Sequence, residues 1–347
     1  MSGAPATSPG TPPGAASASG VGGVLNGVRV VEMGTVITGP AAAVLLGDFG
    51  ADVVKVEKPE TGDPFRTTPD GSLYASNFQA FNRNKRSIAL DTTDPAHLEI
   101  FDTLIAGADV FIQNFRPGAS EKMNAGAARL QAINPRLVYC AISGFGPEGA
   151  DAARPCYDTV AQAPSGYLDL TVDPAQPRVT GPAVADSVTG MYAALGILGA
   201  LHERNATGRG RLVELSMLAA MAHFNIDAFT HFYADGERMT AWTRPAASQA
   251  HVLPCADGKR IALHMSTPPK FWENLVRATG HTELLTQFPT RQSRLDDHPA
   301  VLRALGAIFA QRTRGEWCER LQANHVPHSP VYDASEALES PQAAGPG

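Results

Sequence analysis

One carboxylate, Asp186, stands at the start of a long apolar stretch. Apolar residues recur every three or four positions from Met191 to Leu201, a spacing typical of a helix, and the Asn205–Gly210 cluster ends it. An aspartate here is often an N-cap that accepts hydrogen bonds from backbone N–H groups. The alternative is a carboxylate nucleophile in a site whose helix start holds negative charge. The stretch by itself leaves both interpretations open.

Two further clusters carry groups that suit phosphate or nucleotide binding. Arg83, Lys85 and Arg86 lie beside asparagines, and we interpret them either as a solvated rim or as a phosphate contact. Asn114–Arg116 follows an apolar run, at the carboxyl end of an expected strand, where ligands bind in open α/β sheets. This trio would clamp a nucleotide by hydrogen bonds and stacking, although Phe115 also suits a core position.

Alternating strand and helix patterns position these groups. Strands are expected at 27–34, 51–57, 108–118, 137–143 and 212–216, with helices at 41–49, 94–108 and 217–233. Such βαβ order predicts an α/β fold with a parallel, Rossmann-like sheet. Gly34 and Gly39 do not form a GxGxxG fingerprint, so nothing here supports NAD binding.

A second, smaller α+β domain is expected from residue 240 to 338. It contains two strands joined by the turn Ala256–Lys259, a helix in KFWENLVRATG, a helical stretch at Ala300–Asn324, and a strand followed by a helix start in His325–Leu338. Residues 25–239 form the large domain. Residues 1–24 carry no charge and are expected to be a disordered leader, and residues 339–347 a short tail.

Composition narrows the function classes. The 347 residues are 44% hydrophobic and 18% charged, with a formal net charge of −6, which does not suggest nucleic-acid binding. The longest nearly apolar run is too short for a bilayer. The four cysteines lack CxxC spacing and no His, Cys, Asp and Glu cluster has metal-ligand spacing. We therefore expect a cytoplasmic protein with reduced thiols and no metal, membrane or nucleic-acid partner.

Several motifs together resemble the class III CoA-transferase family. They include KVEKPETGDPFR, ADVFIQNFRPGA, YDTVAQAPSG, VADSVTG and CADGK, and they follow the family's order from about Gly27 to Leu338. This family contains formyl-CoA and carnitine CoA-transferases and the related α-methylacyl-CoA racemases. The resemblance implies a large and a small domain in an interlocked ring homodimer. It also implies coenzyme A and acyl-CoA as substrates, with a carboxylate as acceptor.

The resemblance places the catalytic aspartate at Asp186. It places the CoA contacts at Thr35, Val36, Lys58, Leu90, Asp91, Thr92, Thr93, Asn114, Phe115, Arg116, Lys122 and Tyr157. Attack by Asp186 on an acyl-CoA would give an acyl-aspartyl anhydride, then an aspartyl-CoA thioester that passes CoA to the acceptor. Backbone N–H groups near Ser187 and Gly190 are expected to stabilise the oxyanions.

Two alternatives remain. A racemase needs acid–base groups on both sides of the α-carbon, and racemases of this family carry His and Glu where this chain has Tyr157 and Thr267, which favours the transferase. Family members also continue past the position of Leu338, so the second alternative is a truncated, non-catalytic remnant that binds CoA.

Substrate specificity is not carried over from formyl-CoA transferase. That enzyme has a glutamine where this chain has Ile37, and a glycine-rich loop where this chain has Ala246–Ala250. Ser248, Gln249 and His251 are the residues expected to shape the acceptor site instead.

Overall fold

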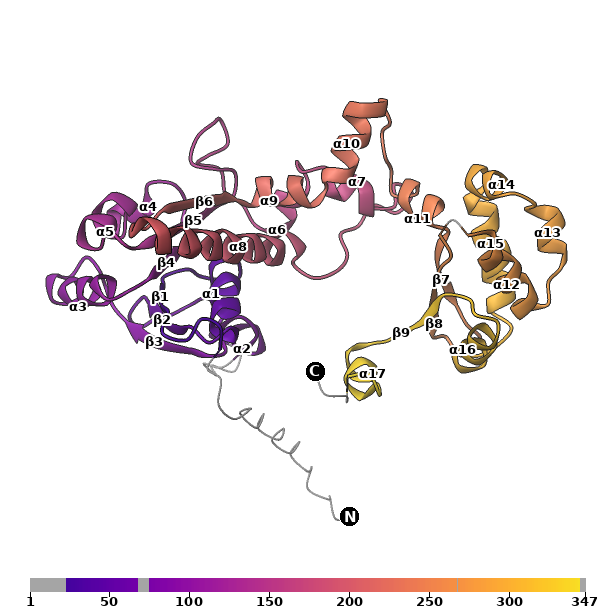
Figure 1. The fold of residues 1–347 in the computed structure, drawn as a ribbon, viewed down its shortest axis with the longest axis horizontal. Helices are drawn as coiled ribbons and strands as arrows, with labels where there is room; N and C mark the ends of the chain where they lie inside the picture. The colour runs from indigo at the N-terminus through magenta and orange to yellow at the C-terminus, as the bar shows by residue number, and fades with distance from the viewer. Residues whose placement is uncertain (1–22, 68–74, 267, 344–347) are drawn as a thin grey trace, which may run out of the picture. The chain divides into compact units, whose positions relative to one another are not determined.

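The computed structural model describes residues 23–67, 75–266 and 268–343. Residues 1–22 of the expected leader (1–24), residues 344–347 of the expected tail (339–347) and Thr267 lie outside the described residues. The described chain divides into two compact units (Figure 1). Unit 1 runs to Gly166 and resumes at Thr180–Asn225, whereas unit 2 comprises Tyr167–Val179 and the chain from Ile226 onward.

Unit 1 is built on a six-stranded sheet in the order β3-β2-β1-β4-β5-β6. All five neighbouring pairs are parallel, which confirms the predicted Rossmann-like α/β sheet. The strand order reverses between β1 and β4, the place where open α/β sheets bind ligands. The strands are β1 Arg29–Glu32, β2 Asp52–Glu57, β3 Lys85–Ala89, β4 Val110–Gln113, β5 Val138–Ser143 and β6 Leu212–Ser216.

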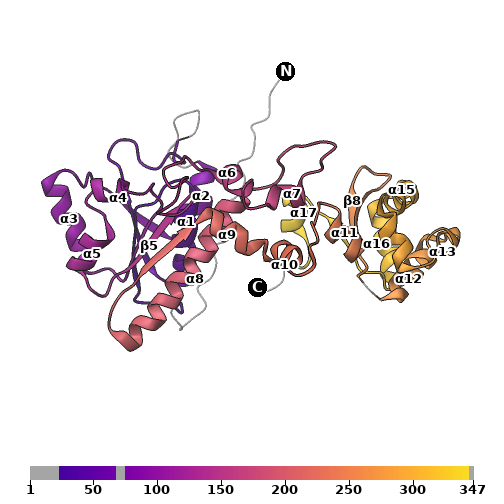
Figure 2. The same ribbon diagram turned by 90° about the horizontal axis from the view of Figure 1, so that it is seen from above.

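Helices cover both faces of this sheet (Figure 2). The helices of unit 1 are α1 Thr38–Asp48, α2 Ser76–Asn82, α3 Pro95–Ala106, α4 Ala119–Lys122, α5 Ala127–Ile133, α6 Asp158–Gln162, α8 Val184–Thr207 and α9 Met217–Phe224. Successive strand residues point to opposite faces, so Val110 and Ile112 pack under α1 and α8 while Phe111 packs under α3 and α5. This double burial explains the near-continuous apolar runs in the strands.

Helices α1 and α8 approach each other closely at Gly190. A Cβ atom at this position would lie 2.7 Å from the Cβ of Ala41 and 3.2 Å from the carbonyl oxygen of Thr38. By length and composition α8 resembles a membrane span, yet its Ala193 and Ile197 are fully buried against the sheet. It packs as the core helix of the unit, and its N-terminus lies on the α1 side of the sheet.

Unit 2 is an α+β arrangement around the antiparallel sheet β7-β8-β9. The predicted hairpin at Ala256–Lys259 is present, with Gly258 at φ 73°. The elements are α7 Tyr167–Thr171, α10 Ile226–Asp235, α11 Thr243–Ser248, β7 Ala250–Pro254, β8 Arg260–His264, α12 Pro269–Thr279, α13 Glu283–Gln287, α14 Arg291–Asp296, α15 His298–Phe309, α16 Arg314–Ala323, β9 His328–Val331 and α17 Ala334–Glu339.

Two helix predictions were wrong in extent. The stretch 217–233 is broken at Asn225 into α9 and α10, and the stretch 300–324 is split into α15 and α16. The second break has a local cause, because Thr313 caps α16 in a reciprocal capping box with Glu316. Apolar periodicity alone does not register such internal caps. Helix α1 also begins earlier than predicted, since Pro40 is tolerated within a first turn.

We predict that Gly190→Ala destabilises unit 1 by about 1–3 kcal/mol, because the added methyl group overpacks the α1–α8 contact. Gly199 lies on the same helix, is exposed, and has open space where a Cβ would go. Gly199→Ala should therefore stabilise by roughly 0.5–1 kcal/mol through helix propensity. Urea unfolding followed by circular dichroism distinguishes the two, and equal effects would contradict the close approach at Gly190.

Candidate active site

The turn between β1 and α1, residues 34–37, lies at the switch point of the sheet. Asn114, which directly follows β4, ties this turn down. Its Oδ1 accepts the Thr35 N–H at 2.9 Å, and its Nδ2 donates to the Thr35 carbonyl at 2.8 Å and to Thr38 Oγ1 at 2.8 Å. The side-chain amide of Asn114 therefore makes its contacts with the turn, while the residue still lines the cavity described below.

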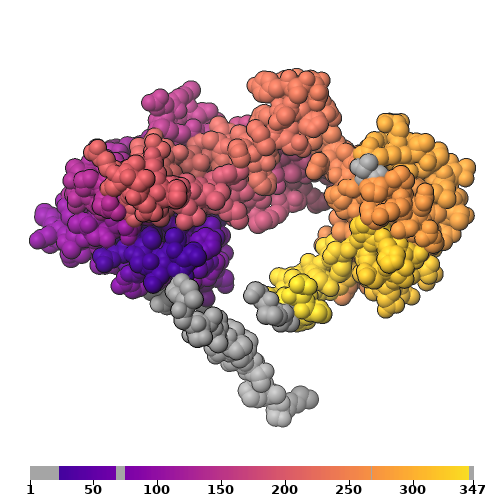
Figure 3. Space-filling view, viewed as in Figure 1, coloured from indigo at the N-terminus to yellow at the C-terminus, as the bar shows by residue number. Residues whose placement is uncertain are grey.

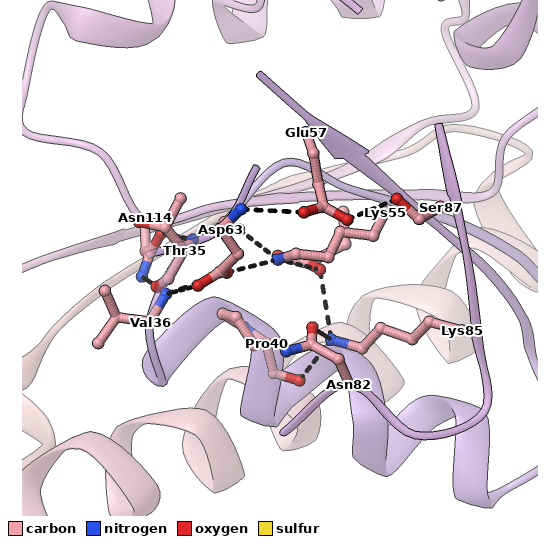
Figure 4. Close-up of polar contacts among 12 residues, drawn as sticks. Thr35, Val36, Pro40, Lys55, Glu57, Asp63, Asn82, Lys85, Ser87 and Asn114 are labelled. Atoms are coloured by element: carbon pink, nitrogen blue, oxygen red, sulfur yellow. Dashed lines mark hydrogen bonds and ion pairs between the residues drawn. The ribbon is translucent and has the colours of Figure 1, made fainter. Parts of the chain in front are cut away.

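A buried charge network supports the same turn (Figure 4). The Lys55 ammonium lies 3.2 Å from Glu32 and 3.0 Å from Asp63, and it donates to the Gly34 carbonyl at 2.7 Å. Burial lowers the pKa of Lys55, but Glu32 and Asp63 together raise it above its usual value. The ammonium is therefore charged and compensated in the core.

Asp63 also holds Val36 in an unusual conformation. Val36 has φ 66°, which β-branched residues rarely adopt, and its N–H donates to Asp63 at 3.3 Å. The Asp63 N–H in turn donates to Glu57 at 2.9 Å, and Arg66 donates two bonds of 2.6 Å to the same carboxylate. Burial alone would raise the pKa of Glu57, but the bonds from Arg66 and Ser87 hold it at about 2. The segment 57–66 thus holds the turn in place through the hydrogen bond from the Val36 N–H to Asp63.

The basic cluster after α2 is used in structural ion pairs. Arg83 pairs with Asp48, Arg86 pairs with Asp52 at 2.7 Å, and the buried Lys85 lies 3.3 Å from Glu32. Burial lowers the pKa of Lys85 to about 8. None of the three lines either of the cavities described below, so the structure does not bring the hypothesised phosphate contact to the site.

Asp186 is the third residue of α8, and the N-cap is Ala183, so the N-cap interpretation of Asp186 was wrong. The cap comes instead from Asp158 at the start of α6. Its Oδ1 accepts the N–H groups of Ala185 at 2.8 Å and of Asp186 at 3.3 Å. Asp158 thereby connects α6 to the first turn of α8.

The expectation that N–H groups near Ser187 and Gly190 stabilise an oxyanion was wrong. The Ser187 N–H donates to the Ala183 carbonyl at 3.1 Å, inside the first turn of the helix. Gly190 lies within α8 and is in contact with α1. Neither position offers a free N–H group to a bound substrate, because both belong to the regular helix.

Asp186 is 9% exposed, and burial together with the nearby carboxylate of Asp158 raises its pKa to about 7. The neighbouring thiol of Cys156 has its pKa raised by burial and by the charge of Asp186, so it is a protonated thiol. The site consequently contains a carboxylate whose ionised form is poorly solvated, and therefore more basic than an ordinary aspartate.

Asp186 opens into a cavity of about 260 Å³. Its walls come from the turn after β1, the strand ends of β4 and β5, the loop after β5 and the start of α9. That loop, with Pro147–Asp151 exposed, stands out from the surface of unit 1 (Figure 3). Six predicted residues line the cavity beside Asp186, namely Thr35, Val36, Asn114, Phe115, Arg116 and Tyr157.

A second cavity of about 490 Å³ adjoins the first, since Thr35 and Phe115 line both. The remaining predicted residues gather there: Lys58, Leu90, Asp91, Thr92 and Thr93. Lys122 is exposed and lines neither cavity, although the next residue, Met123, lines the second. Unit 1 therefore contains two adjoining cavities, with Asp186 lining one and Lys58 lining the other.

Sequence reasoning did not name Asp158, Arg154, Cys156 or Met217 as site residues, although it expected the loop before Tyr157, which carries Arg154 and Cys156, to contact CoA. Arg154, Cys156 and Met217 line the Asp186 cavity, and Asp158 caps α8 from behind. Asp158 lies next to the predicted Tyr157 and begins α6, but the cap it supplies belongs to a helix 27 residues away, which no local pattern indicates. In the described part of the chain, no three His, Cys, Asp or Glu side chains are grouped to hold a metal ion.

The raised pKa of Asp186 predicts a pH-dependent stability. The unfolded chain releases this proton near pH 3.8 but the folded protein only near pH 7, so the aspartate lowers stability as the pH rises from about 4 to 7 and the loss is constant above that. Asp186→Asn should raise the free energy of unfolding at pH 8 by on the order of 2–4 kcal/mol, and very little near pH 4.

Urea unfolding at both pH values measures this effect. Asp169→Asn, at an exposed position, is the matched control and should change stability by less than about 0.5 kcal/mol at either pH. A destabilised Asp186→Asn variant at pH 8 would contradict the electrostatic strain.

Comparison with known proteins agrees with this arrangement. The family model for CoA-transferase family III matches residues 25–347. The chain is 32% identical over 331 residues to a succinyl-CoA:mesaconate CoA-transferase of Haloarcula hispanica, covering 92% of this chain and 83% of the relative. It is 33% identical to a formyl-CoA:oxalate CoA-transferase of Streptomyces avermitilis, covering 91% and 82%.

A solved structure shows the same fold. The crystal structure of a CAIB/BAIF family protein from Brucella suis matches with a TM-score of 0.84 at 32% identity, covering 93% of this chain and 87% of that one. The predicted resemblance is confirmed, and the chain belongs to CoA-transferase family III.

Proposed function

We propose that this enzyme transfers CoA from an acyl-CoA to a carboxylic acid, with Asp186 as the covalent nucleophile. The observation that carries the proposal is a buried carboxylate of raised pKa, in a cavity that adjoins a second cavity lined by Lys58 and residues 90–93. A poorly solvated carboxylate is a better nucleophile toward a thioester than a hydrated one, because little hydration is lost on attack.

The proposed reaction alternates attack by a carboxylate with attack by the CoA thiolate. The Asp186 carboxylate attacks the thioester carbonyl, the C–S bond breaks, and an acyl-aspartyl anhydride and CoA thiolate result. The thiolate then attacks the aspartyl carbonyl, releases the donor carboxylate and leaves an aspartyl-CoA thioester. The acceptor carboxylate attacks this thioester, its C–S bond breaks, and an acceptor–aspartyl anhydride and CoA thiolate form. The thiolate then attacks the acceptor's carbonyl, which gives the new acyl-CoA and releases the Asp186 carboxylate.

The negative charge that develops on the attacked oxygen needs donors. The start of α1 supplies them in this proposal, since Ile37 and Thr38 line the Asp186 cavity and no side chain caps this helix. Uncapped N–H groups at a helix start, together with the helix dipole, stabilise an oxyanion by roughly 3 kcal/mol or more per donor. These groups replace the expected donors near Ser187 and Gly190.

The CoA molecule would extend across both cavities, with its thioester beside Asp186 and its nucleotide in the cavity that Lys58 lines. Lys58 is exposed at the end of β2, and an ammonium there suits a phosphate group. Phe115 lines both cavities and is positioned to contact the pantetheine arm between them.

We further propose a small dicarboxylic acid as acceptor. The relatives are named for mesaconate and oxalate, and each of these has a second carboxylate that does not react. Arg116 and Arg154 line the Asp186 cavity and are exposed, so either guanidinium suits that second group. A panel of mono- and dicarboxylates with succinyl-CoA tests this; equal rates for matched mono- and diacids would contradict it.

The racemase is the weaker candidate. Its expected acid–base positions carry Tyr157, which is 70% exposed, and Thr267. The interlocked homodimer implied by the resemblance, and the cytoplasmic location expected from the cysteines and composition, are further proposals. Sedimentation of the purified chain tests the dimer. A monomer that binds CoA without exchanging it would favour the non-catalytic remnant instead.

Covalent trapping tests the nucleophile. Incubation with succinyl-CoA and then hydroxylamine should convert Asp186 to its hydroxamate, detected by mass spectrometry of the peptide. Asp186→Ala should show neither the adduct nor exchange activity, with a loss of at least about 10³-fold expected for removal of a covalent nucleophile. Exchange at the wild-type rate in this variant would refute the mechanism.

The pH profile tests the state of Asp186. Because attack requires the ionised form, kcat/KM should fall about tenfold per pH unit below about pH 7 and level off above it. Asp158→Asn keeps an oxygen that can accept the N–H bonds of α8 but removes the like charge, so the acidic limb should move to lower pH. An unchanged profile in this variant would contradict the coupling of the two carboxylates.

Measurement of CoA affinity tests whether CoA binds in the cavity that Lys58 lines. Lys58→Ala should raise the Kd for CoA by roughly tenfold in calorimetry and reduce its dependence on salt, because one phosphate contact is lost. Lys270→Ala, an exposed lysine in unit 2, is the control and should leave the Kd unchanged. Lys122→Ala measured alongside decides whether Lys122, which lines neither cavity, contacts CoA at all.

A further inference from the structure

Unit 2 contains a large cavity of its own, of about 760 Å³. Trp242, His251, His264, His298, Leu302 and His328 are among its lining residues. They come from the segment before α11, the three strands of the small sheet and α15, and all belong to unit 2. The size is that of a typical small-molecule site, and the walls are mainly apolar with histidines as the polar groups.

Two of these histidines are buried with almost no hydrogen-bond partners. His251 and His298 are each 4% exposed, and their rings stack with centroids 5.0 Å apart and planes 11° apart. Within the described chain, neither ring nitrogen of His251 has a hydrogen-bond partner, and the His298 ring has only a weak contact with the Ala250 backbone. A neutral imidazole has one donor and one acceptor, and leaving such groups unpaired inside a protein costs roughly 1–3 kcal/mol each. Because these rings line a cavity, their nitrogens are available to a ligand that enters it.

The charges around the pair are few. His264 contacts Ser266 at 3.2 Å and His328 contacts the Val326 carbonyl at 2.8 Å. On the packed helix α14, Arg291 donates to the Ala247 carbonyl and Arg294 to Gln249, and Asp297 accepts from Ala300 at the start of α15. No lysine or arginine lines the cavity itself, so a multiply charged phosphate would remain uncompensated there.

Burial and the neighbouring His298 lower the pKa of His251 to about 4, and burial lowers that of His298 as well. Both rings are thus neutral near pH 7. A ligand with a single negative charge could bind if one imidazole took up a proton at the same time, because the net charge of the cavity would not change. The two oxygens of a carboxylate would then accept hydrogen bonds from the ring nitrogens.

We propose that this cavity is a second ligand site, which binds a monocarboxylic acid with an apolar or aromatic body beside Trp242 and the His251–His298 pair. The carboxylate takes hydrogen bonds from the two rings, one of which gains a proton from solvent, while Leu302 and Trp242 contact the body. The site rests on unit 2 alone and goes beyond the proposed transfer reaction at Asp186.

Calorimetry of the full chain with benzoate, and with benzamide as the uncharged isostere, tests the proposal. Benzoate should bind with uptake of about one proton, measured from the dependence of the heat on the buffer's ionisation enthalpy. Its affinity should fall about tenfold from pH 5 to pH 6, because proton uptake becomes less favourable as the pH rises above the free pKa of His251. Benzamide should bind at least tenfold more weakly than benzoate at pH 5 and show no proton uptake.

Variants assign the signal to this cavity. His251→Phe and His298→Phe should each abolish proton-linked binding, whereas the same change at the exposed His202 should not. Asp186→Asn should retain it, which separates this site from any acid bound beside Asp186. Because His251→Phe removes unpaired nitrogens, its melting temperature without benzoate should equal or exceed that of the wild type, and benzoate should no longer raise it.

Three results would overturn the inference: no benzoate binding by the wild type at pH 5, equal binding of benzamide, or proton-linked binding that survives His251→Phe but disappears in Asp186→Asn. The first and second need only the wild-type protein, so they decide the matter even if a variant fails to fold.

Discussion

The site depends on the ion pairs of one buried ammonium group, that of Lys55 in β2. Its ammonium binds Glu32, Asp63 and the Gly34 carbonyl together, so one cation joins β1, β2 and the 57–66 segment. An isolated buried charge would be prohibitive, and the two carboxylates compensate it. The network in turn holds Val36 at its positive φ, which gives the turn before α1 its shape.

A second electrostatic arrangement lies on the other side of the same cavity. Asp158 stabilises the first turn of α8 by accepting two N–H bonds, and the same negative charge opposes the ionisation of Asp186. Asp158 therefore both stabilises the helix start and adds to the effect of burial, which is the larger cause of the raised pKa of Asp186. Electrostatic strain of this kind is typical of functional sites, where the rest of the fold supplies the stability that the site loses.

Much of the fold and part of the site were predictable from local patterns. The apolar runs and their spacing predicted the strands of the parallel sheet, and the motifs predicted which residues gather in the two cavities. The helix breaks at Asn225 and before Thr313 were not predicted, because capping interrupts a helix without interrupting its apolar periodicity. The basic cluster at residues 83–86 misled for another reason, since its partners Asp48, Asp52 and Glu32 are distant in the chain.

The sequence by itself determined the family and the α/β class and predicted Asp186 as the candidate nucleophile, because these depend on residue types and on spacing along the chain. Only the tertiary structure decided that Asp186 is a strained carboxylate rather than a helix cap, that Asn114 ties a turn, and that His251 meets His298. Each of these depends on groups that are remote in sequence, and burial and Coulomb interactions are set by distance in space.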